Sequence, residues 1–469
     1  MEGVVLNGQS EDKKENKMGV MPIGKLLLNM SLPMMISMLV QACYNVVDSV
    51  FVAKITDPSV GENAGTAAIS ALGMAFPFQT LLIAFGAGTC VGVNAVLSKA
   101  LGEKDTHTVN KATANGIFLS ACSYVLFLLI GLFLPGVLIK SQGGEGLTLL
   151  YGTQYLRIVC VFSFGLYTQF IFERLLQATG RTILTMVTQS VGALINIILD
   201  PIFIFVFKMG VAGAAYATVI GQCVAGVLAI IFNLKMNPDI KIDFHGFRPD
   251  GRMIGRIYAV GIPTIIMQSI GSVMTYLMNK LLNGINPASV AVFTVYFKLQ
   301  SFFFMPLFGL NNGLVPILAY NFGAQKRSRM YEVIKKSMVV GLLLMVLGFI
   351  AFEVIPEPLL RIFDTGDPSL IILGKPALRI IGIHYLIAWF CIVGGSVYQA
   401  LGNGFYSMMV SVSRQLVVLL PVAYVLGKNF GLPAIWWCFP IAELMSLLMN
   451  VIFLVRINKN VISQVADNP

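Results

Sequence analysis

Hydrophobic residues dominate the chain in long runs, separated by short polar segments. Each run is long enough to cross a bilayer, because about 20 helical residues span the hydrocarbon core. Twelve such runs can be counted, over residues 26–53, 66–98, 109–139, 148–172, 182–207, 211–234, 256–283, 288–321, 332–356, 370–400, 405–427 and 432–456. The pattern predicts an all-α polytopic membrane protein with 12 transmembrane helices. The composition agrees, since only 12% of the 469 residues are charged, against about a quarter in soluble proteins.

Lysine and arginine are concentrated in alternate loops. The side that carries both termini has 21 of them and the other side has five. Cytoplasmic loops of membrane proteins are enriched in these residues, so we expect a multi-pass protein of the plasma (inner) membrane with both termini in the cytoplasm. The net charge of +10 is therefore a sign of topology, and no nucleic-acid partner is expected. The first apolar run is too long for a signal-peptide core, so no cleavage is expected.

The two halves of the chain resemble each other. The longest polar linker, 235–255, divides it into an N-terminal lobe, 26–234, and a C-terminal lobe, 256–457, with cytoplasmic tails at 1–25 and 458–469. Four residues of the first lobe recur 221 positions later: Gln79, Gly88, Gly92 and Gly102 return as Gln300, Gly309, Gly313 and Gly323. Six helices per half is an even number, so both halves enter the membrane from the same side. Two parallel six-helix repeats are typical of transporters.

One polar stripe interrupts the first apolar run. It consists of Gln41, Tyr44, Asn45 and Asp48, at spacings of i, i+3, i+4 and i+7, which places them on one helix face. A carboxylate within a membrane costs several kcal/mol unless it faces protein or water. Asp48 is therefore expected to face a cavity or a partner, and the other stripe members are candidate cavity residues.

The fifth run supplies a partner for Asp48. Asn196 and Asp200 lie four residues apart and share a helix face. Pro201 cannot donate a backbone hydrogen bond, which loosens the helix beside the carboxylate. Asp48, Asp200 and Thr218 of the sixth run are expected at similar depth. The second half carries Met278 and Leu420 in place of the two acids. We therefore expect Asp48 and Asp200 to hold an ion together; the alternative is that the acids only fix helix packing.

The second lobe offers both uncharged and basic candidates for binding a substrate. Its first helix carries a polar stripe of Gln268, Ser272, Thr275 and Asn279. Lys298 and Arg414 are two intramembrane cations, and a basic second lobe would suit an anionic substrate. All six are candidate cavity residues.

These residues resemble those of the multidrug and toxic compound extrusion (MATE) transporters, over about residues 25–457. The matching features are the six-plus-six plan, the first helix with Pro33 and Asp48, the stretch Asn196-Ile-Ile-Leu-Asp200-Pro201, and the stretch 213–218. The chain looks most similar to the prokaryotic DinF-like branch. That resemblance implies a cation site made of Asp48 in the first helix, Asn196 and Asp200 in the fifth, and Thr218 in the sixth. The acid that NorM-like transporters carry in the seventh helix is absent.

The sequence thus predicts an antiporter, coupled to H⁺ or Na⁺, that exports amphipathic, cationic organic compounds by alternating access. Two acids at one buried site favour holding a proton or a metal cation. The alternative is a flippase for a lipid-linked oligosaccharide, which should line its cavity with several basic residues. No phosphate-binding loop, zinc-ligand spacing or nucleophile with a base is found, so neither an enzyme nor a cofactor is expected. We expect a monomer whose partners are organic small molecules, the ion and membrane lipid.

Overall fold

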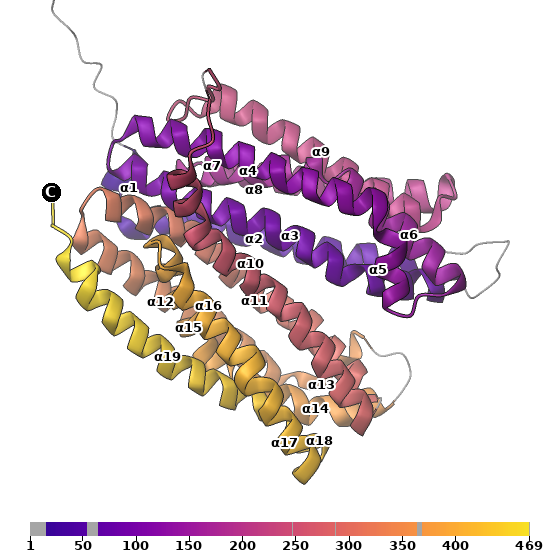
Figure 1. The fold of residues 1–469 in the computed structure, drawn as a ribbon. Helices are drawn as coiled ribbons and strands as arrows, with labels where there is room; N and C mark the ends of the chain where they lie inside the picture. Colours follow the sequence, from indigo (N-terminus) through magenta and orange to yellow (C-terminus); the bar gives the residue numbers. More distant parts are fainter. Residues whose placement is uncertain (1–15, 54–63, 246, 287, 364–367, 469) are drawn as a thin grey trace, which may run out of the picture.

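The computed structural model describes residues 16–53, 64–245, 247–286, 288–363 and 368–468. Residues 1–15 of the N-terminal tail lie outside this range, as does the side chain of Asn45. The described chain is helical and forms two lobes (Figure 1), which confirms the predicted fold class.

The first lobe follows a short N-terminal helix, α1 (Lys17–Val20). Its helices are α2 (Ile23–Ala53), α3 (Ala64–Gly102), α4 (Thr106–Phe133), α5 (Pro135–Ser141), α6 (Gly146–Val161), α7 (Phe164–Ala178), α8 (Thr182–Pro201) and α9 (Gly210–Met236). A π-helix, Ile202–Val206, extends α8. Residues 237–250 then lead to the second lobe.

The second lobe repeats this order. Its helices are α10 (Gly251–Ile285), α11 (Ala288–Gly323), α12 (Arg327–Val354), α13 (Pro356–Arg361), α14 (Pro368–Gly382), α15 (Tyr385–Ala400), α16 (Gly404–Val412), α17 (Leu420–Phe430), α18 (Leu432–Ile435) and α19 (Cys438–Asn460). A π-helix, Ser413–Leu419, joins α16 to α17, and a 3₁₀ turn, Ile462–Gln464, follows α19.

Among the described residues, ten helices are long and apolar enough to cross a membrane, and two bent pairs raise the number to twelve if each pair is one span. The pair α6 and α7 is bent by 45°, and the pair α14 and α15 by 52°. The first bend is at Phe162 and Ser163, and the second is 221 positions on, at Ile383 and His384. The apolar pattern counts each pair as one span and does not show the bends, whose symmetry reflects the repeat.

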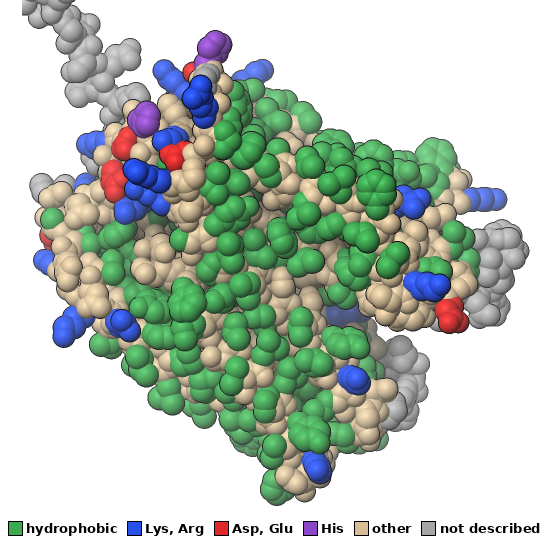
Figure 2. Space-filling model, viewed as in Figure 1, with side chains coloured by type: hydrophobic (Ala, Val, Ile, Leu, Met, Phe, Trp, Pro, Cys, Tyr) green, Lys and Arg blue, Asp and Glu red, His purple; other side chains and the backbone are tan. Residues whose placement is uncertain are grey.

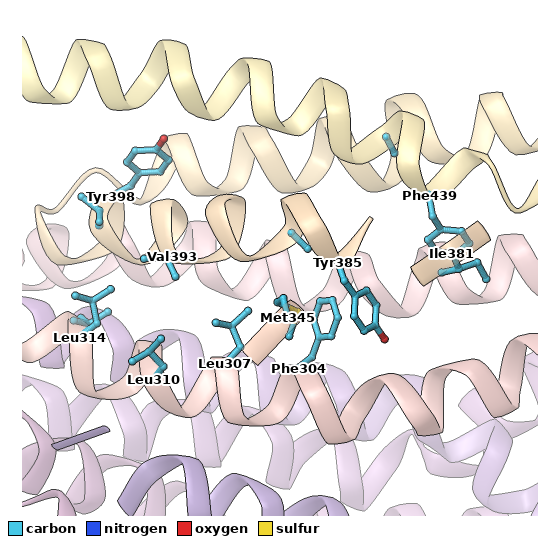
Figure 3. Packing of buried hydrophobic residues seen from close by; sticks show 14 of the residues in the cluster. Phe304, Leu307, Leu310, Leu314, Met345, Ile381, Tyr385, Val393, Tyr398 and Phe439 are labelled. Atoms are coloured by element: carbon cyan, nitrogen blue, oxygen red, sulfur yellow. The ribbon is translucent and has the colours of Figure 1, made fainter. Parts of the chain in front are cut away.

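Each lobe has its own apolar core. In the second lobe, Phe304 and Leu307 of α11 face Met345 of α12 and Tyr385 of α15 (Figure 3). The rings of Phe304 and Tyr385 pack edge to face, with centroids 5.1 Å apart. On the face shown in Figure 2, apolar side chains also cover the surface between the two ends of the molecule, as expected for helices that contact lipid.

The lobes meet at one end of the molecule. We call it the basic end: α2 and α10 begin there, α3 and α11 finish there, and both the C-terminus and the residue 237–250 linker lie there (Figure 1). At the opposite end, α5 and α6 lie apart from α13, α14 and α17 (Figure 1). Figure 2 shows a recess between the lobes on that side.

Repeated glycines allow the lobes to touch at the basic end. A Cβ on Gly92 of α3 would clash with the backbone of Ile257 on α10, and one on Gly313 of α11 would clash with Ser31 on α2. Gly102 and Gly323 are related in the same way: a Cβ on Gly102 of α3 would clash with the backbone of α11, and one on Gly323 of α11 would clash with the backbone of α3. The glycines that recur at the 221-residue offset therefore form a pseudo-two-fold seam. It joins α3 to α10 and α2 to α11, and its axis passes between α3 and α11, where Gly102 and Gly323 lie.

The helix α1 connects both lobes across this seam. The Asn16 amide donates to the Thr179 carbonyl of the first lobe, at 3.2 Å. The Arg329 guanidinium of the second lobe donates to the carbonyls of Met18 and Met21, at 3.0 and 2.8 Å. Met18 itself is fully buried, so α1 is an integral part of the closed basic end.

Candidate functional site

The candidate site lies within the first lobe, where α8 packs against both α2 and α9. Asp200, near the end of α8, is fully buried, and Asp48 of α2 is partly buried beside it. Their carboxyl groups lie close enough to interact directly. Two carboxylates held this close in a buried site repel each other, so the pair favours binding a proton or a cation. The second oxygen of Asp48, Oδ1, is buried and has no hydrogen-bond partner among the described residues.

Asn196 connects this pair to α9. With its amide oriented to satisfy both neighbours, Asn196 donates to Asp200 Oδ2 at 3.2 Å. Its oxygen then accepts from the Thr218 backbone N–H at 3.1 Å and from the Thr218 hydroxyl at 3.2 Å. Asn196 and Thr218 are both buried. The structure therefore brings together the four residues that the sequence assigns to an ion site, on three helices.

The backbone is irregular at the same place. The α-helix ends at Pro201, directly after Asp200, and continues as the π-helix Ile202–Val206. Pro201 has no N–H to donate to the preceding turn. Single π-turns of this kind occur often at functional sites, because they leave backbone groups less tightly paired.

Two tyrosines complete the surroundings of the acids. Tyr44 of α2 and Tyr155 of α6 both lie close enough to Asp48 and Asp200 to interact with them electrostatically. The Tyr155 hydroxyl donates to Gln79 of α3, at 3.5 Å. Sequence reasoning identified Tyr44 but missed Tyr155. The signal was available, because the repeat replaces Tyr155 by Ala377, just as it replaces the two acids by apolar residues.

Gln41 of the first-helix stripe does not join this cluster. Gln41 is exposed, two turns before Asp48 on α2. The side chain of Asn45 lies outside the described residues.

The oxygen atoms at the site are of the kind that hard cations prefer. Carboxylate, amide and hydroxyl oxygens from Asp48, Asp200, Asn196 and Thr218 suit Na⁺, and the carboxyl pair alone suffices for a proton. No group of three or more His, Cys, Asp or Glu side chains in the described ranges is arranged to hold a metal, so the site offers two acids and neutral oxygens only.

The stripe on α10 is less buried. Gln268, Ser272, Thr275 and Asn279 are all partly exposed. The Thr275 hydroxyl donates to the Gly271 carbonyl at 2.9 Å. Asn279 Oδ1 is buried without a hydrogen-bond partner in the described part of the chain. Its neighbour Met278, the counterpart of Asp48, is fully buried.

The two cations of the second lobe are placed differently from one another. Arg414, in the π-helix Ser413–Leu419, forms an ion pair with Glu443 of α19, with Nη1 and Oε2 3.1 Å apart. Glu443 is 2% exposed, so Arg414 is not the free cation that the sequence suggested. Lys298 is exposed, and its ammonium lies 5.7 Å from the centre of the Phe363 ring. The basic pair expected to receive an anionic substrate is thus reduced to one exposed lysine.

The structure also corrects the end of the fourth run. The sequence places its end at residue 172 and Arg174 in a loop, but α7 continues to Ala178. Arg174 donates across the lobe seam to Asn312 of α11, at 2.9 Å. Its neighbour Glu173 is buried and accepts hydrogen bonds from Gln169, Thr188 and Gln189, at 2.7 to 2.9 Å. Sequence reasoning missed this buried acid, because the apolar run was ended one residue before it.

Comparison with known proteins agrees with this architecture. The family model MatE matches residues 33–202 and 263–425. Two repeats of transmembrane helices are a common architecture of membrane transporters. The chain belongs to the MatE family, and it is a transporter and not an enzyme.

Its relatives include curated export proteins. The chain is 27% identical to the multidrug export protein MepA of Staphylococcus aureus, over 93% of this chain and 94% of that protein. It is 28% identical to MepA of Staphylococcus haemolyticus, over 90% and 91%.

Solved structures share the fold. One is a multidrug resistance MATE family transporter of the MOP superfamily in an outward-facing conformation, with a TM-score of 0.89 at 21% identity, covering 95% of this chain and 98% of that one. Another is a MOP superfamily transporter from Pyrococcus furiosus, with a TM-score of 0.88 at 21% identity and the same coverage.

Proposed function

We propose that this protein is an ion-coupled antiporter that exports amphipathic, cationic organic compounds. The observation that carries the proposal is the close pair of Asp48 and Asp200, which Asn196 links to Thr218 inside the first lobe. The names of the MepA proteins, which are multidrug exporters, support the substrate class. The ion is H⁺ or Na⁺, since the oxygen atoms suit either.

The coupling follows from charge. When the ion is absent, two buried carboxylates repel each other and are poorly solvated. Binding a proton or Na⁺ removes that repulsion and favours close packing of α2, α8 and α9. Any difference in ion affinity between the outward-open and inward-open arrangements then lets ion entry drive substrate release.

The basic end is the cytoplasmic end in this proposal, following the bias in lysine and arginine. The protein would lie in the plasma membrane as a monomer, with both termini in the cytoplasm. The closed basic end and the separated opposite ends then correspond to a cavity open to the outside.

The flippase alternative requires several cations around a pyrophosphate. The ion pair between Arg414 and Glu443 removes one of the candidates, so the structure favours the antiporter.

Reconstitution into liposomes tests this function. Efflux of a panel of cationic dyes is measured under an imposed pH gradient, an imposed Na⁺ gradient, or neither. We expect at least one gradient to drive dye accumulation against its concentration. Dye movement that is equal with and without both gradients would contradict ion coupling, and no movement of any dye would contradict the substrate class.

A further inference from the structure

A groove on the membrane-facing surface crosses the seam between the lobes near the basic end. It has a volume of about 520 Å³ and is formed by α2 on one side and by α11 and α12 on the other. Its floor and walls are apolar, and include Leu28, Leu32, Met35, Val339 and Val340. The residues at its outer edge, such as Leu28 and Val339, are 61% and 50% exposed. The groove is distinct from the Asp48 site, which lies farther along α2.

Charged residues stand at one end of the groove only. Lys335, Lys336 and Glu332 line it where α12 leaves the basic end. The Lys336 ammonium pairs with Glu332 at 2.6 Å, and Lys335 is exposed and has no ion-pair partner in the part of the chain described. Residues 337–352 of α12 carry no charge, so Lys335 and Lys336 mark the level of the membrane surface. The rim has a net charge of +1, which matches one monoanionic phosphodiester.

The depth of the groove matches one leaflet. Its α2 wall extends from Gly24 to Met35, about 16 Å at 1.5 Å per residue. Half of the hydrocarbon core is about 15 Å thick. A groove with cations at the headgroup level and apolar walls down to the bilayer centre fits the shape of one lipid molecule in one leaflet and complements the charge of an anionic headgroup.

We propose that this groove binds an anionic glycerophospholipid, with an acyl chain against Leu32 and Met35 and the phosphate beside Lys335 and Lys336. An acyl chain gains little on leaving other lipid tails, so selectivity must come from the headgroup and from the shape of the groove. Basic residues between helices at the cytoplasmic surface are the usual determinants of such sites. Because α2 belongs to the first lobe and α12 to the second, the bound lipid contacts both lobes and stabilises the closed basic end.

Native mass spectrometry of the purified protein tests the proposal. The protein in detergent is supplied with phosphatidylglycerol or phosphatidylcholine of identical acyl chains, and the retained lipid is counted. We expect one phosphatidylglycerol to be retained in preference to phosphatidylcholine. The double variant Lys335→Gln/Lys336→Gln should lower that preference about tenfold, since a lysine near the membrane surface attracts anionic lipids and this variant removes two of them. The matched control is Lys140→Gln/Lys428→Gln, two exposed lysines at the opposite end.

A second pair of variants tests the apolar part. Leu32→Trp fills the groove and should reduce retention of both lipids, whereas Leu343→Trp, on an exposed part of α12 that does not line the groove, should not. Thermal stability should rise with phosphatidylglycerol in the wild type and in Leu343→Trp, and not in the lysine double variant.

Three results would overturn the proposal. They are equal retention of the two lipids by the wild type, equal loss of preference in the control lysine pair, and unchanged retention in Leu32→Trp. The lysine variants lie at an exposed rim, so they remain informative if the tryptophan variant does not fold.

Discussion

Asp48 and Asp200 are the residues on which the proposed function depends. The expected result for Asp48→Asn is loss of ion-driven efflux by at least about tenfold, because the amide cannot release a proton or balance a cation. Efflux from cells and protein level in the membrane are measured together. The matched control is Asp250→Asn, the same change outside the membrane. There, the hydrogen bond from Lys111 holds the pKa of Asp250 below its usual range, and Asn can replace Asp as the helix cap. If Asp48→Asn exports at the wild-type rate, the coupling role is wrong.

The two acids should also behave as one unit. Because their carboxyl groups interact directly, they are expected to hold protons jointly, and removing either one should relieve the other. Substrate or ion binding is measured against pH in detergent for the wild type, Asp48→Asn, Asp200→Asn and the double variant. We expect the pH dependence to collapse in each single variant, with little further change in the double. Effects that simply add would show two independent acids.

Residues on α10 should act on substrate choice. Asn279 Oδ1 is buried without a partner in the described structure, and Gln268 is partly exposed on the same stripe. Asn279→Ala and Gln268→Ala are expected to change the relative efflux of several dyes by several-fold, with the ion dependence retained. Loss of ion dependence with an unchanged dye range would place the ion site in the other lobe.

At the scale of helices, the seam between α3 and α10 depends on glycine. Gly92→Ala introduces a Cβ that clashes with the Ile257 backbone, and overpacking of this kind costs about 1–3 kcal/mol. Gly73→Ala, on the same helix, meets nothing within 4 Å and should be neutral or slightly stabilising. The two variants are compared by heating them in detergent and measuring, by size-exclusion chromatography, the fraction that remains folded. Equal stability of both variants would show that the seam does not stabilise the protein.

The helices themselves could largely be predicted, because long apolar runs leave little choice of structure. What the runs could not show is where a helix bends. The bends at Phe162 and at His384 lie inside continuous apolar sequence, so only the packing against neighbouring helices reveals them. The same limit hid Glu173. Its partners Thr188 and Gln189 come from the next helix. The sequence pattern of one helix does not show which groups of a neighbouring helix donate hydrogen bonds to an acid.

The site was predictable for a different reason. A charged residue in a membrane needs a partner, and the repeat separates residues shared by both halves from those found in one. The shared glycines Gly92 and Gly313 form the seam, and the unshared Asp48 and Asp200 form the pair. Comparing the two halves did not predict the ion pair between Arg414 and Glu443, because their contact depends on how α19 packs against the π-helix Ser413–Leu419.

For the whole molecule, the sequence specifies two lobes but does not choose which end is closed, since a transporter of the proposed kind adopts both arrangements in turn. The structure has the basic end closed. Rigid lobes that rock against each other must close one end when the other opens. Spin labels test this in a background without the seven native cysteines. Lys140→Cys with Lys428→Cys reports on the open end, and Lys235→Cys with Lys459→Cys on the basic end; all four positions are exposed. Across changes of pH, Na⁺ and substrate, the two label distances should vary in opposite senses. Conditions that lengthen or shorten both together, or that move one end alone, would exclude rocking of rigid lobes and place the motion within a lobe instead.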